Sequence, residues 1–295
     1  MSIHLTDSFK PLAKALRKHF DLVQSDAHHP ARFQWDWWHL PGRYTHLRTP
    51  AELYFEPALH SQLVETITSF ARKEFGCSSI SPIWLSNYVE GCEQRLHADR
   101  PHGPWAFVFS LTADFRKFQG GETIIMRDEI LRFWESTAAS SPLASQTDGQ
   151  AFEENEILQK IPSQFGRLLV FDPRVPHGVS RVSGTVNPLE GRLVLHGWFT
   201  APQPFVDGAL VPGKVEPVLE GLDREMESLG AVTDPGTVAY RISIRADGSV
   251  SKIKKLKSSM RESKDLDRLI TRYFKTAKFP KARGTSELTL PLTIG

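Results

Sequence analysis

The chain has 295 residues, of which 40% are hydrophobic and 24% are charged, enough for one large folded domain and a small one. Its 36 lysines and arginines nearly balance its 34 acidic residues, so the net charge of +2 gives no reason to expect a nucleic-acid partner. The two cysteines, Cys77 and Cys92, fit neither a disulfide framework nor a cysteine-based zinc site. No stretch is apolar enough for a signal peptide or a membrane span, so we expect a cytoplasmic protein.

Helical patterns come first along the chain. Apolar residues at helical spacing predict a helix over residues 7–19 and a longer helix over residues 51–75. From Ile83 onward the pattern changes to short β-rich runs: PIWLSNYV, WAFVFSLT, ETIIM, GRLLVF, GVSRV and RLVLHGWF. Helices followed by many short strands predict a mainly β fold, a sandwich or barrel with helices packed outside it.

Two stretches interrupt this pattern. Residues 136–150 are small and polar, so we interpret them as a mobile surface loop, and residues 133–150 as a region that sets substrate specificity. Residues 206–235 are rich in proline and glycine and are predicted to be a linker that contains one short helix. This division gives one domain over residues 1–205 and a second over residues 236–295.

The C-terminal segment has its own compact pattern. VAYRISIRADGSVSKIKKLKSS alternates around an Ala-Asp-Gly turn and predicts a β-hairpin; a helix over residues 264–275 and a last strand, SELTLPLTI, follow. This ββαβ order, with IRADGSVSKIKKLKSS, LDRLITRYFKTAKFPKA and LTLPLTI, resembles the C-terminal domain of TonB. The resemblance implies a small α+β domain with a protein partner.

Three side chains in two motifs could share one metal ion. In RLHADRPHGPW, His97 and Asp99 are two residues apart at the end of a predicted strand and therefore point to the same face. In GRLLVFDPRVPHGVSRV, His177 opens a strand that would face them from the opposite side of a barrel. Two imidazoles and one carboxylate form a facial triad that suits iron(II), because three coordination positions stay open. Zinc, with a further protein ligand or one water, is the alternative metal.

A cosubstrate with a distal carboxylate needs a cationic partner. Arg192 begins the strand RLVLHGWF, and its guanidinium fork could hold both carboxylate oxygens. Arg181 is the competing candidate, because it is evenly spaced from His177, although it lies closer to the metal. His196 and Trp198 share the parity of Arg192 and are expected to line the substrate pocket if that arginine points inward. His102 is expected to be an exposed loop residue.

Taken in order, Y-x₈-H-x-D, the GGET strand, LLVFDPRVPHGV and the basic residue on the next strand resemble the prolyl-4-hydroxylase-like branch of the 2-oxoglutarate/iron(II) oxygenase superfamily. The resemblance covers residues 82–200 and implies a double-stranded β-helix, or jelly roll. It implies Fe(II), 2-oxoglutarate and dioxygen as cofactors, with ascorbate as a candidate reductant. Carried over by residue, His97, Asp99 and His177 are the implied iron ligands and catalytic residues. Arg192 is the implied partner of the distal carboxylate, and Tyr88 a hydroxyl donor to the same group.

The resemblance also bears on the reaction. It implies decarboxylation of 2-oxoglutarate to succinate and attack on a C–H bond of a peptide, amino acid or other small molecule. Hydroxylation is favoured over halogenation, because halogenating relatives replace the carboxylate ligand and Asp99 is intact. Gly120 and Gly121 resemble the family's turn into the GGE-type strand. The chain departs from the branch by inserting SGTVNPLEG before Arg192. The alternatives are a non-catalytic metal-binding scaffold or interaction protein that docks through its C-terminal domain, and a cupin-like zinc protein.

Overall fold

The computed structural model describes residues 3–99, 102–135, 153–227 and 235–294. The chain divides into two compact units, each described by itself below. The first unit contains Ile3–Val64 and Ser81–Trp198, and the second contains Glu65–Ile80 and the chain from Phe199 onward. None of the described helices is both long and apolar enough to cross a membrane.

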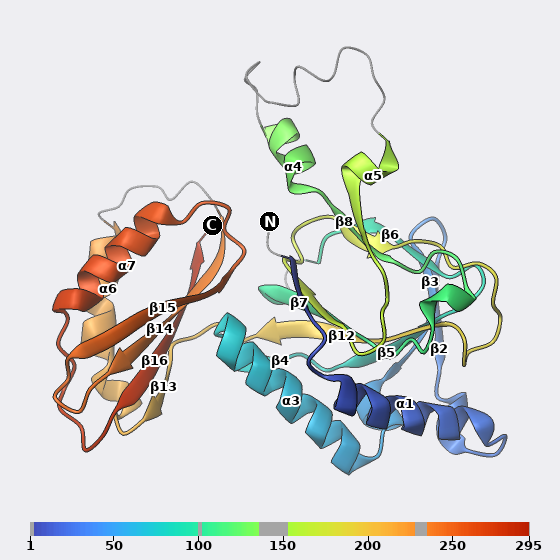
Figure 1. The fold of residues 1–295 in the computed structure, drawn as a ribbon, viewed down its shortest axis with the longest axis horizontal. Coiled ribbons are helices and arrows are strands. Elements are labelled where there is room, and N and C mark those ends of the chain that lie inside the picture. Colours follow the sequence, from blue (N-terminus) through green and yellow to red (C-terminus); the bar gives the residue numbers. More distant parts are fainter. Residues whose placement is uncertain (1–2, 100–101, 136–152, 228–234, 295) are drawn as a thin grey trace. The chain divides into compact units, whose positions relative to one another are not determined.

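The first unit is built around eight strands in two sets of four. Figure 1 shows the ribbon of this unit. The major set has the order β10-β7-β12-β5, and the minor set has the order β6-β11-β8-β9. The pairs β10–β7, β12–β5, β6–β11, β11–β8 and β8–β9 are antiparallel. The bounds are β5 (Trp84–Tyr88), β6 (Glu93–His97), β7 (Trp105–Ser110), β8 (Thr123–Met126), β9 (Leu158–Ile161), β10 (Leu168–Phe171), β11 (His177–Val179) and β12 (Arg192–Thr200). This strand order is that of a jelly roll, the double-stranded β-helix expected from the sequence.

A hairpin joins the two sets. Its strands are β2 (Asp36–Leu40) and β3 (Tyr44–Pro50), and β3 pairs with β5 of the major set and with β6 of the minor set. A further strand, β1 (Ile3–Thr6), extends the major set beyond β10. These three strands were not expected from the sequence, yet the hairpin supplies several side chains to the interior of the barrel.

The helices in the N-terminal part of the chain differ in detail from the prediction. The first is α1 (Lys10–Ser25), and the single helix expected over residues 51–75 is two, α2 (Ala51–Tyr54) and α3 (Pro57–Phe75). Phe55 between them is extended, with φ −92° and ψ 150°. Because Pro57 disfavours helical backbone at the residue before it and favours the first turn of a new helix, it separates the two.

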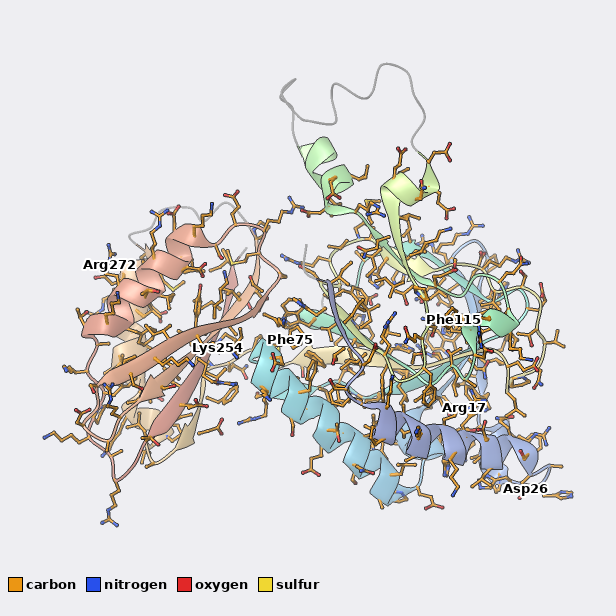
Figure 2. The ribbon with its side chains drawn as sticks, in the orientation of Figure 1. Arg17, Asp26, Phe75, Phe115, Lys254 and Arg272 are labelled. Atoms are coloured by element: carbon orange, nitrogen blue, oxygen red, sulfur yellow. The ribbon has the colours of Figure 1, made fainter. Side chains whose placement is uncertain are left out.

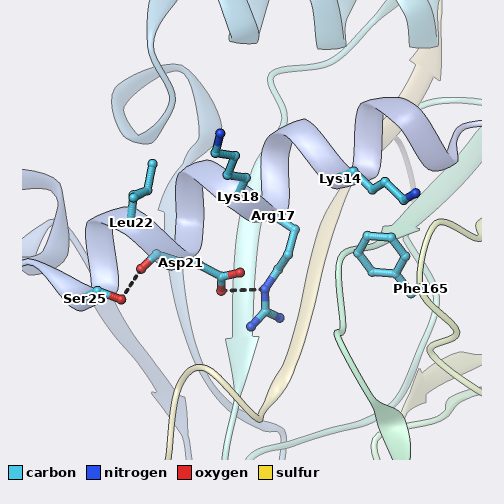
Figure 3. A pocket seen from close by; sticks show the side chains of 7 residues that line it. All are labelled: Lys14, Arg17, Lys18, Asp21, Leu22, Ser25 and Phe165. Atoms are coloured by element: carbon cyan, nitrogen blue, oxygen red, sulfur yellow. Dashed lines mark hydrogen bonds and ion pairs between the residues drawn. The ribbon is translucent and has the colours of Figure 1, made fainter.

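A buried arginine fixes α1 to the barrel. Arg17 donates from Nε to Asp21 at 2.8 Å, as Figure 3 shows, and from Nη1 and Nη2 to the carbonyls of Leu111 and Leu189. All three guanidinium nitrogens are therefore bonded within the protein. Arg17 also lines the pocket drawn in Figure 3. Because its three nitrogens already bond within the protein, we assign Arg17 a structural role and not a ligand-binding one.

The second unit contains a four-stranded sheet of order β13-β16-β14-β15, the helices α6 and α7, and the C-terminal part of α3. The bounds are β13 (Phe205–Gly208), α6 (Glu216–Glu227), β14 (Gly236–Ile244), β15 (Val250–Ser258), α7 (Lys264–Thr276) and β16 (Ser286–Ile294). The hairpin, helix and last strand lie where the sequence predicts them. Lys254 on β15 and Arg272 on α7 point away from the core (Figure 2), which is formed between the sheet and the helices.

The predicted linker over residues 206–235 contains a strand and a helix of this second unit. Strand β13 pairs with β16, and Leu222 of α6 is 1% exposed in the same apolar core as Ile270 and Phe274 of α7. Apolar residues that pack in this core explain why a proline- and glycine-rich sequence forms regular structure over the described residues 205–208 and 216–227. The loop expected over residues 136–150 lies outside the described residues; the short helices α4 (Asp128–Glu135) and α5 (Glu154–Ile157) precede and follow it.

Candidate metal and cosubstrate site

The three predicted metal ligands lie together at one end of the minor set. His97 ends β6 and His177 begins β11, directly opposite it in the strand register; Asp99 follows two residues after β6. The Nε2 atoms of His97 and His177 lie 3.4 Å from Oδ1 and Oδ2 of Asp99, respectively. One ligand atom from each residue falls within 4.8 Å of the others, a spacing that one metal ion can bridge.

Backbone carbonyls orient both imidazoles. Nδ1 of His97 is 2.8 Å from the carbonyl oxygen of Arg95, and Nδ1 of His177 is 2.9 Å from that of Val175. A carbonyl accepts only from an N–H, so each partner assigns the proton to Nδ1 and leaves Nε2 to bind a cation. The ring of Phe171 meets His177 edge-on at 4.7 Å and limits its rotation.

Asp99 is held as a carboxylate. Burial raises its pKa, but in the metal-free site the imidazoles of His177 and His97, when protonated on both nitrogens, donate hydrogen bonds from Nε2 and add positive charge, and together they hold the pKa of Asp99 well below its usual range. The backbone N–H of Asp99 donates to the carbonyl of Pro173 at 2.9 Å, which fixes the loop. Two imidazole nitrogens and one carboxylate oxygen form the donor set expected of a non-haem iron(II) site with open positions.

Arg192 is a buried cation whose hydrogen bonds are incomplete. It is 1% exposed, and its Nη2 donates to Oγ1 of Thr123 at 3.2 Å. Nε and Nη1 are buried and have no hydrogen-bond partner among the described residues. Because Arg192 lies on β12 of the major set and Thr123 on β8 of the minor set, the side chain crosses the barrel interior. In contrast to Arg17, this arginine keeps two nitrogens for a ligand, and an anionic group would offset the cost of burying its charge.

The strand register places this arginine at a suitable separation from the metal ligands. On the paired strands β8 and β11, Ile125 lies opposite His177, and Thr123, the partner of Arg192, lies opposite Val179. Two residues along a strand correspond to about 7 Å. A five-carbon dicarboxylic acid can reach across such a separation, with one end at the metal and the other at the guanidinium. The residues therefore fit 2-oxoglutarate.

Arg181, the competing arginine, is exposed. Strand β11 ends at Val179, so the even spacing from His177 does not carry as far as Arg181. Its backbone instead packs on the glycine turn: a Cβ on Gly120 would lie 1.9 Å from the carbonyl oxygen of Arg181. Gly120 and Gly121 both have φ +74°, so both glycines occur where the backbone requires them.

Tyr88 lies beside Arg192 and is buried. The guanidinium carbon of Arg192 is 4.6 Å from the centroid of the Tyr88 ring, and the two residues are register partners across β5 and β12. Its hydroxyl donates weakly to Oε1 of Gln94 at 3.5 Å, and Nε2 of Gln94 lies 3.3 Å from Nε2 of His97. Burial raises the pKa of Tyr88, so the hydroxyl stays protonated and able to donate.

His196 and Trp198 share the face of β12 that carries Arg192. Nε2 of His196 lies 2.9 Å from Oγ of Ser86. Burial, His46 and the two arginines Arg192 and Arg48 lower the pKa of His196 to about 3, so its imidazole is neutral.

Trp198 packs against the apolar cluster that includes Phe171, the neighbour of His177. The expected exposed histidine, His102, is exposed, and its ring stacks on Trp198 with centroids 4.5 Å apart.

Sequence reasoning missed the residues of this interior that come from the β2–β3 hairpin and β8, together with one neighbouring tryptophan on β5. They are Trp38, His46, Arg48, Trp84 and Thr123. The available signal was the Pro-Gly turn in DWWHLPGRYTHLR, flanked by alternating residues that predict a hairpin. Aromatic residues occupy both inward-facing and outward-facing positions of this segment, so the hydrophobic pattern does not show which side chains face the interior.

A jelly roll that combines a His-Asp-His triad with a buried arginine defines the class of 2-oxoglutarate-dependent metalloenzymes. Residues 83–200 match the family model described as the 2OG-Fe(II) oxygenase superfamily. The barrel is therefore a 2OG-Fe(II) oxygenase domain, and the protein is an oxygenase that uses iron(II), 2-oxoglutarate and dioxygen.

Solved structures of low sequence identity resemble the chain. A Pseudomonas putida prolyl-4-hydroxylase is 16% identical with a TM-score of 0.45, over 68% of this chain and 92% of its own. A viral collagen prolyl hydroxylase from Paramecium Bursaria Chlorella virus-1 is 11% identical with a TM-score of 0.40, over 67% and 95%. The epimerase SnoN from nogalamycin biosynthesis is 14% identical with a TM-score of 0.40, over 66% and 76%. No curated protein sequence matches the chain.

Proposed function

We propose that His97, Asp99 and His177 bind the iron, that Arg192 holds the distal carboxylate of 2-oxoglutarate, and that the enzyme hydroxylates a C–H bond of a small molecule or peptide. The observation that carries this assignment is the Arg192 guanidinium, buried inside the barrel with two unpartnered nitrogens. Burying a cation without a partner costs free energy, and the distal carboxylate of the cosubstrate would offset that cost by pairing with it. The triad lies at the separation along β8 and β11 that this anion must cross.

Each residue has a distinct task in this proposal. Iron and 2-oxoglutarate, when bound, supply the oxidising chemistry in which 2-oxoglutarate becomes succinate and carbon dioxide and one oxygen atom reaches the substrate. His97 and His177 present Nε2, because their Nδ1 protons are held by Arg95 and Val175. Asp99 supplies the negative charge and fills a coordination position that halogenation would need open. Hydroxylation is therefore favoured.

The interior around the arginine orients the cosubstrate. Thr123 fixes one edge of the guanidinium, and the Tyr88 ring covers it at 4.6 Å, so the fork is held in one plane before the ligand arrives. We assign Tyr88 a supporting contact to the carboxylate through its protonated hydroxyl. His196 and Trp198, on the same strand face, are proposed to line the volume beside the metal.

The proposal has a direct spectroscopic test. Mixing the protein with iron(II) and 2-oxoglutarate without oxygen should produce a weak visible charge-transfer band, and Arg192→Ala should require far more 2-oxoglutarate to produce it. Succinate release should then be screened with protein, peptide and amino-acid pools kept separate. A protein that binds zinc tightly and gives no band would favour the cupin-like alternative, and one that binds neither metal nor cosubstrate would favour the scaffold.

A protein partner for the C-terminal domain and a cytoplasmic location are separate proposals. Strand β15, at the edge of the second sheet, carries lysines at positions 252, 254, 255 and 257. Charged edge strands resist addition of another strand, so we expect a partner to bind elsewhere on this domain than along β15. Both cysteines are buried and free, in keeping with a reducing compartment.

A further inference from the structure

A second arginine lies on the same sheet face as Arg192. In the register, Arg48 of β3 pairs with Ser86 of β5, and Ser86 pairs with Val194 of β12. Directly opposed residues of antiparallel strands project to the same side, and residues two apart on one strand do so as well. Arg48 therefore shares the face that carries Arg192 and His196. The charge of Asp99 acts on His196, which places this face toward the metal ligands.

Two indole rings enclose the Arg48 guanidinium. Its central carbon lies 2.9 Å from the ring centroid of Trp38 and 3.9 Å from that of Trp84. Stacked rings cover the two flat faces of a guanidinium and leave only its edge, where the N–H donors lie. A ligand can therefore reach Arg48 only in the guanidinium plane. A carboxylate, which accepts two parallel hydrogen bonds in that plane, is the group that fits.

Arg48 has no carboxylate in direct contact. Its Nε is buried without a hydrogen-bond partner, and none of the described carboxylates forms an ion pair with its guanidinium. Asp36, its cross-strand neighbour on β2, is exposed and acts on it only through space. Burial lowers the pKa of Arg48 to about 10, which still leaves the side chain charged at neutral pH.

The remaining titratable groups of this face do not supply a negative charge. His46 and His196 are neutral, because burial and the two arginines lower their pKa values to about 4 and about 3. Glu122 acts through space on Arg192, and Asp36 acts through space on Arg48. Neither carboxylate forms an ion pair with Arg48, so the in-plane donors of this guanidinium have no carboxylate partner among the described residues, and a ligand carboxylate can supply one.

We propose that Arg48, clamped between Trp38 and Trp84, binds the carboxylate of the primary substrate, which is therefore an organic acid with one free carboxylate near the C–H bond to be hydroxylated. This inference rests on the proposed function, because it assigns the substrate class of the same site. A free amino or organic acid and the C-terminus of a peptide offer the same group. The side-chain environment of Arg48 selects that group and does not depend on what lies beyond it.

The test compares acids with their matched carboxamides, which keep the shape and lose the charge. The full-length protein, loaded with iron(II) and 2-oxoglutarate, is assayed for substrate-stimulated succinate release with three sets: free amino acids, simple organic acids, and N-acetylated peptides with a free C-terminus. Each set includes the primary amides. We expect acids to be preferred over their amides by roughly ten- to a hundredfold in kcat/KM, the effect of one charge-assisted pair.

Variants of Arg48 then test the residue itself. Arg48→Gln should bring the acid-to-amide preference close to one, and Arg48→Lys, which keeps the charge and loses the fork, should restore part of it. The exposed Arg116→Gln is the matched control and should keep the wild-type preference. Because the preference is a ratio, a partly folded variant does not mimic the result.

The outcomes separate this inference from the proposed function. If the wild type binds 2-oxoglutarate but responds equally to acids and amides, or to none of them, Arg48 does not select a carboxylate. Retention of the preference in Arg48→Gln overturns the inference in the same way. If the wild type gives no 2-oxoglutarate band and no basal succinate, the proposed function itself fails. The three sets also identify the source, since only peptides respond if the site takes a C-terminus.

Discussion

His177 at the start of β11 lies directly opposite His97 at the end of β6, with their ring centroids 4.5 Å apart. A strand slip of one residue would turn one imidazole to the outer face of the barrel, because side chains alternate. The register shift between His177 and Val179 falls next to this pair. Strand pairing therefore sets the donor geometry before any metal arrives.

Removal of any one ligand should abolish iron binding. His97→Ala, Asp99→Ala and His177→Ala each leave two of three donors, and a two-donor site does not hold iron(II) against dilution. We expect iron content after anaerobic reconstitution and desalting to fall from about one per chain to near zero, with 2-oxoglutarate turnover lost. The variants should remain soluble, since the three side chains are partly exposed or at the barrel end.

His102→Ala provides the control for these three variants. His102 stacks on Trp198 and contacts none of the three ligands in the described structure. It should keep its iron. Loss of iron from His102→Ala, or full turnover by any of the three ligand variants, would contradict the assignment of the triad.

Substitution of Arg192 should weaken the cosubstrate more than the metal. Its paired charge-assisted hydrogen bonds contribute on the order of 1.5–3 kcal/mol each, so Arg192→Ala should raise the apparent Kd for 2-oxoglutarate by roughly ten- to several-hundredfold. Arg192→Lys should fall between the wild type and Arg192→Ala. Iron affinity, measured in the absence of 2-oxoglutarate, should stay near the wild-type value.

Arg181→Ala decides between the two arginines. Arg181 is exposed, so this variant should bind 2-oxoglutarate like the wild type. A large effect at Arg181 with none at Arg192 would reverse the assignment, and no effect at either would mean that neither arginine holds the cosubstrate.

The sequence predicts the jelly roll and the three metal ligands because local patterns encode them. Short alternating strands and the two motifs around Asp99 and His177 depend on residues close together in the chain. The hairpin β2–β3 was missed because tryptophans and histidines occupy both its inward and outward positions; Trp37, for example, is 57% exposed while Trp38 is partly buried. Composition alone cannot assign a face in such a strand.

The identity of the unpartnered arginines also required the structure. In the sequence, Arg17, Arg48 and Arg192 are each a basic residue among apolar ones. Only their contacts in the structure show that Arg17 is fully bonded, whereas Arg48 and Arg192 have buried nitrogens without a partner. Those contacts come from segments far apart in the chain, such as Leu189 for Arg17 and Thr123 for Arg192. The choice between Arg181 and Arg192 likewise depends on where β11 ends, which no residue pattern marks.

Truncation should depend on where the C-terminal unit begins. Ending the chain after Pro235 removes β14, β15, α7 and β16 but keeps β13 and α6. Val215, which directly precedes α6, and Leu222 within α6 would then lose their apolar core. Ending it after Pro204 removes both. We expect the chain of residues 1–204 to be the more soluble of the two by size-exclusion chromatography. The 1–204 chain should also retain 2-oxoglutarate decarboxylation, because every proposed site residue lies before residue 204.

The full-length protein is the reference for both truncations. If the 1–204 chain loses iron or aggregates while the 1–235 chain does not, residues 205–235 fold with the barrel and not with the C-terminal sheet.

Acid should destabilise the metal-free protein through its buried neutral histidines. His46 is 4% exposed, stacks on Tyr88 at 5.0 Å and faces Arg48 on its own strand and Arg192 on β12. Burial and these two cations lower its pKa from 6.5 in the unfolded chain to about 4. A histidine with a depressed folded pKa contributes its full stability above pH 6.5 and loses it as the pH falls toward 4, because only the unfolded chain takes up the proton in that window. His196 acts in the same direction.

The contribution of His46 can be isolated by comparing two pH values. Between pH 7 and pH 5, protonation of the unfolded chain at this one residue should lower the free energy of unfolding by about 2 kcal/mol. His46→Phe keeps the stacked ring and removes the titrating group. The free energy of unfolding of this variant, measured with urea on metal-free protein, should therefore fall between pH 7 and pH 5 by about 2 kcal/mol less than that of the wild type. His28→Phe, at an exposed loop histidine, should show the wild-type loss. An unchanged pH dependence in His46→Phe would mean that His46 is not held neutral by its buried position between the two arginines.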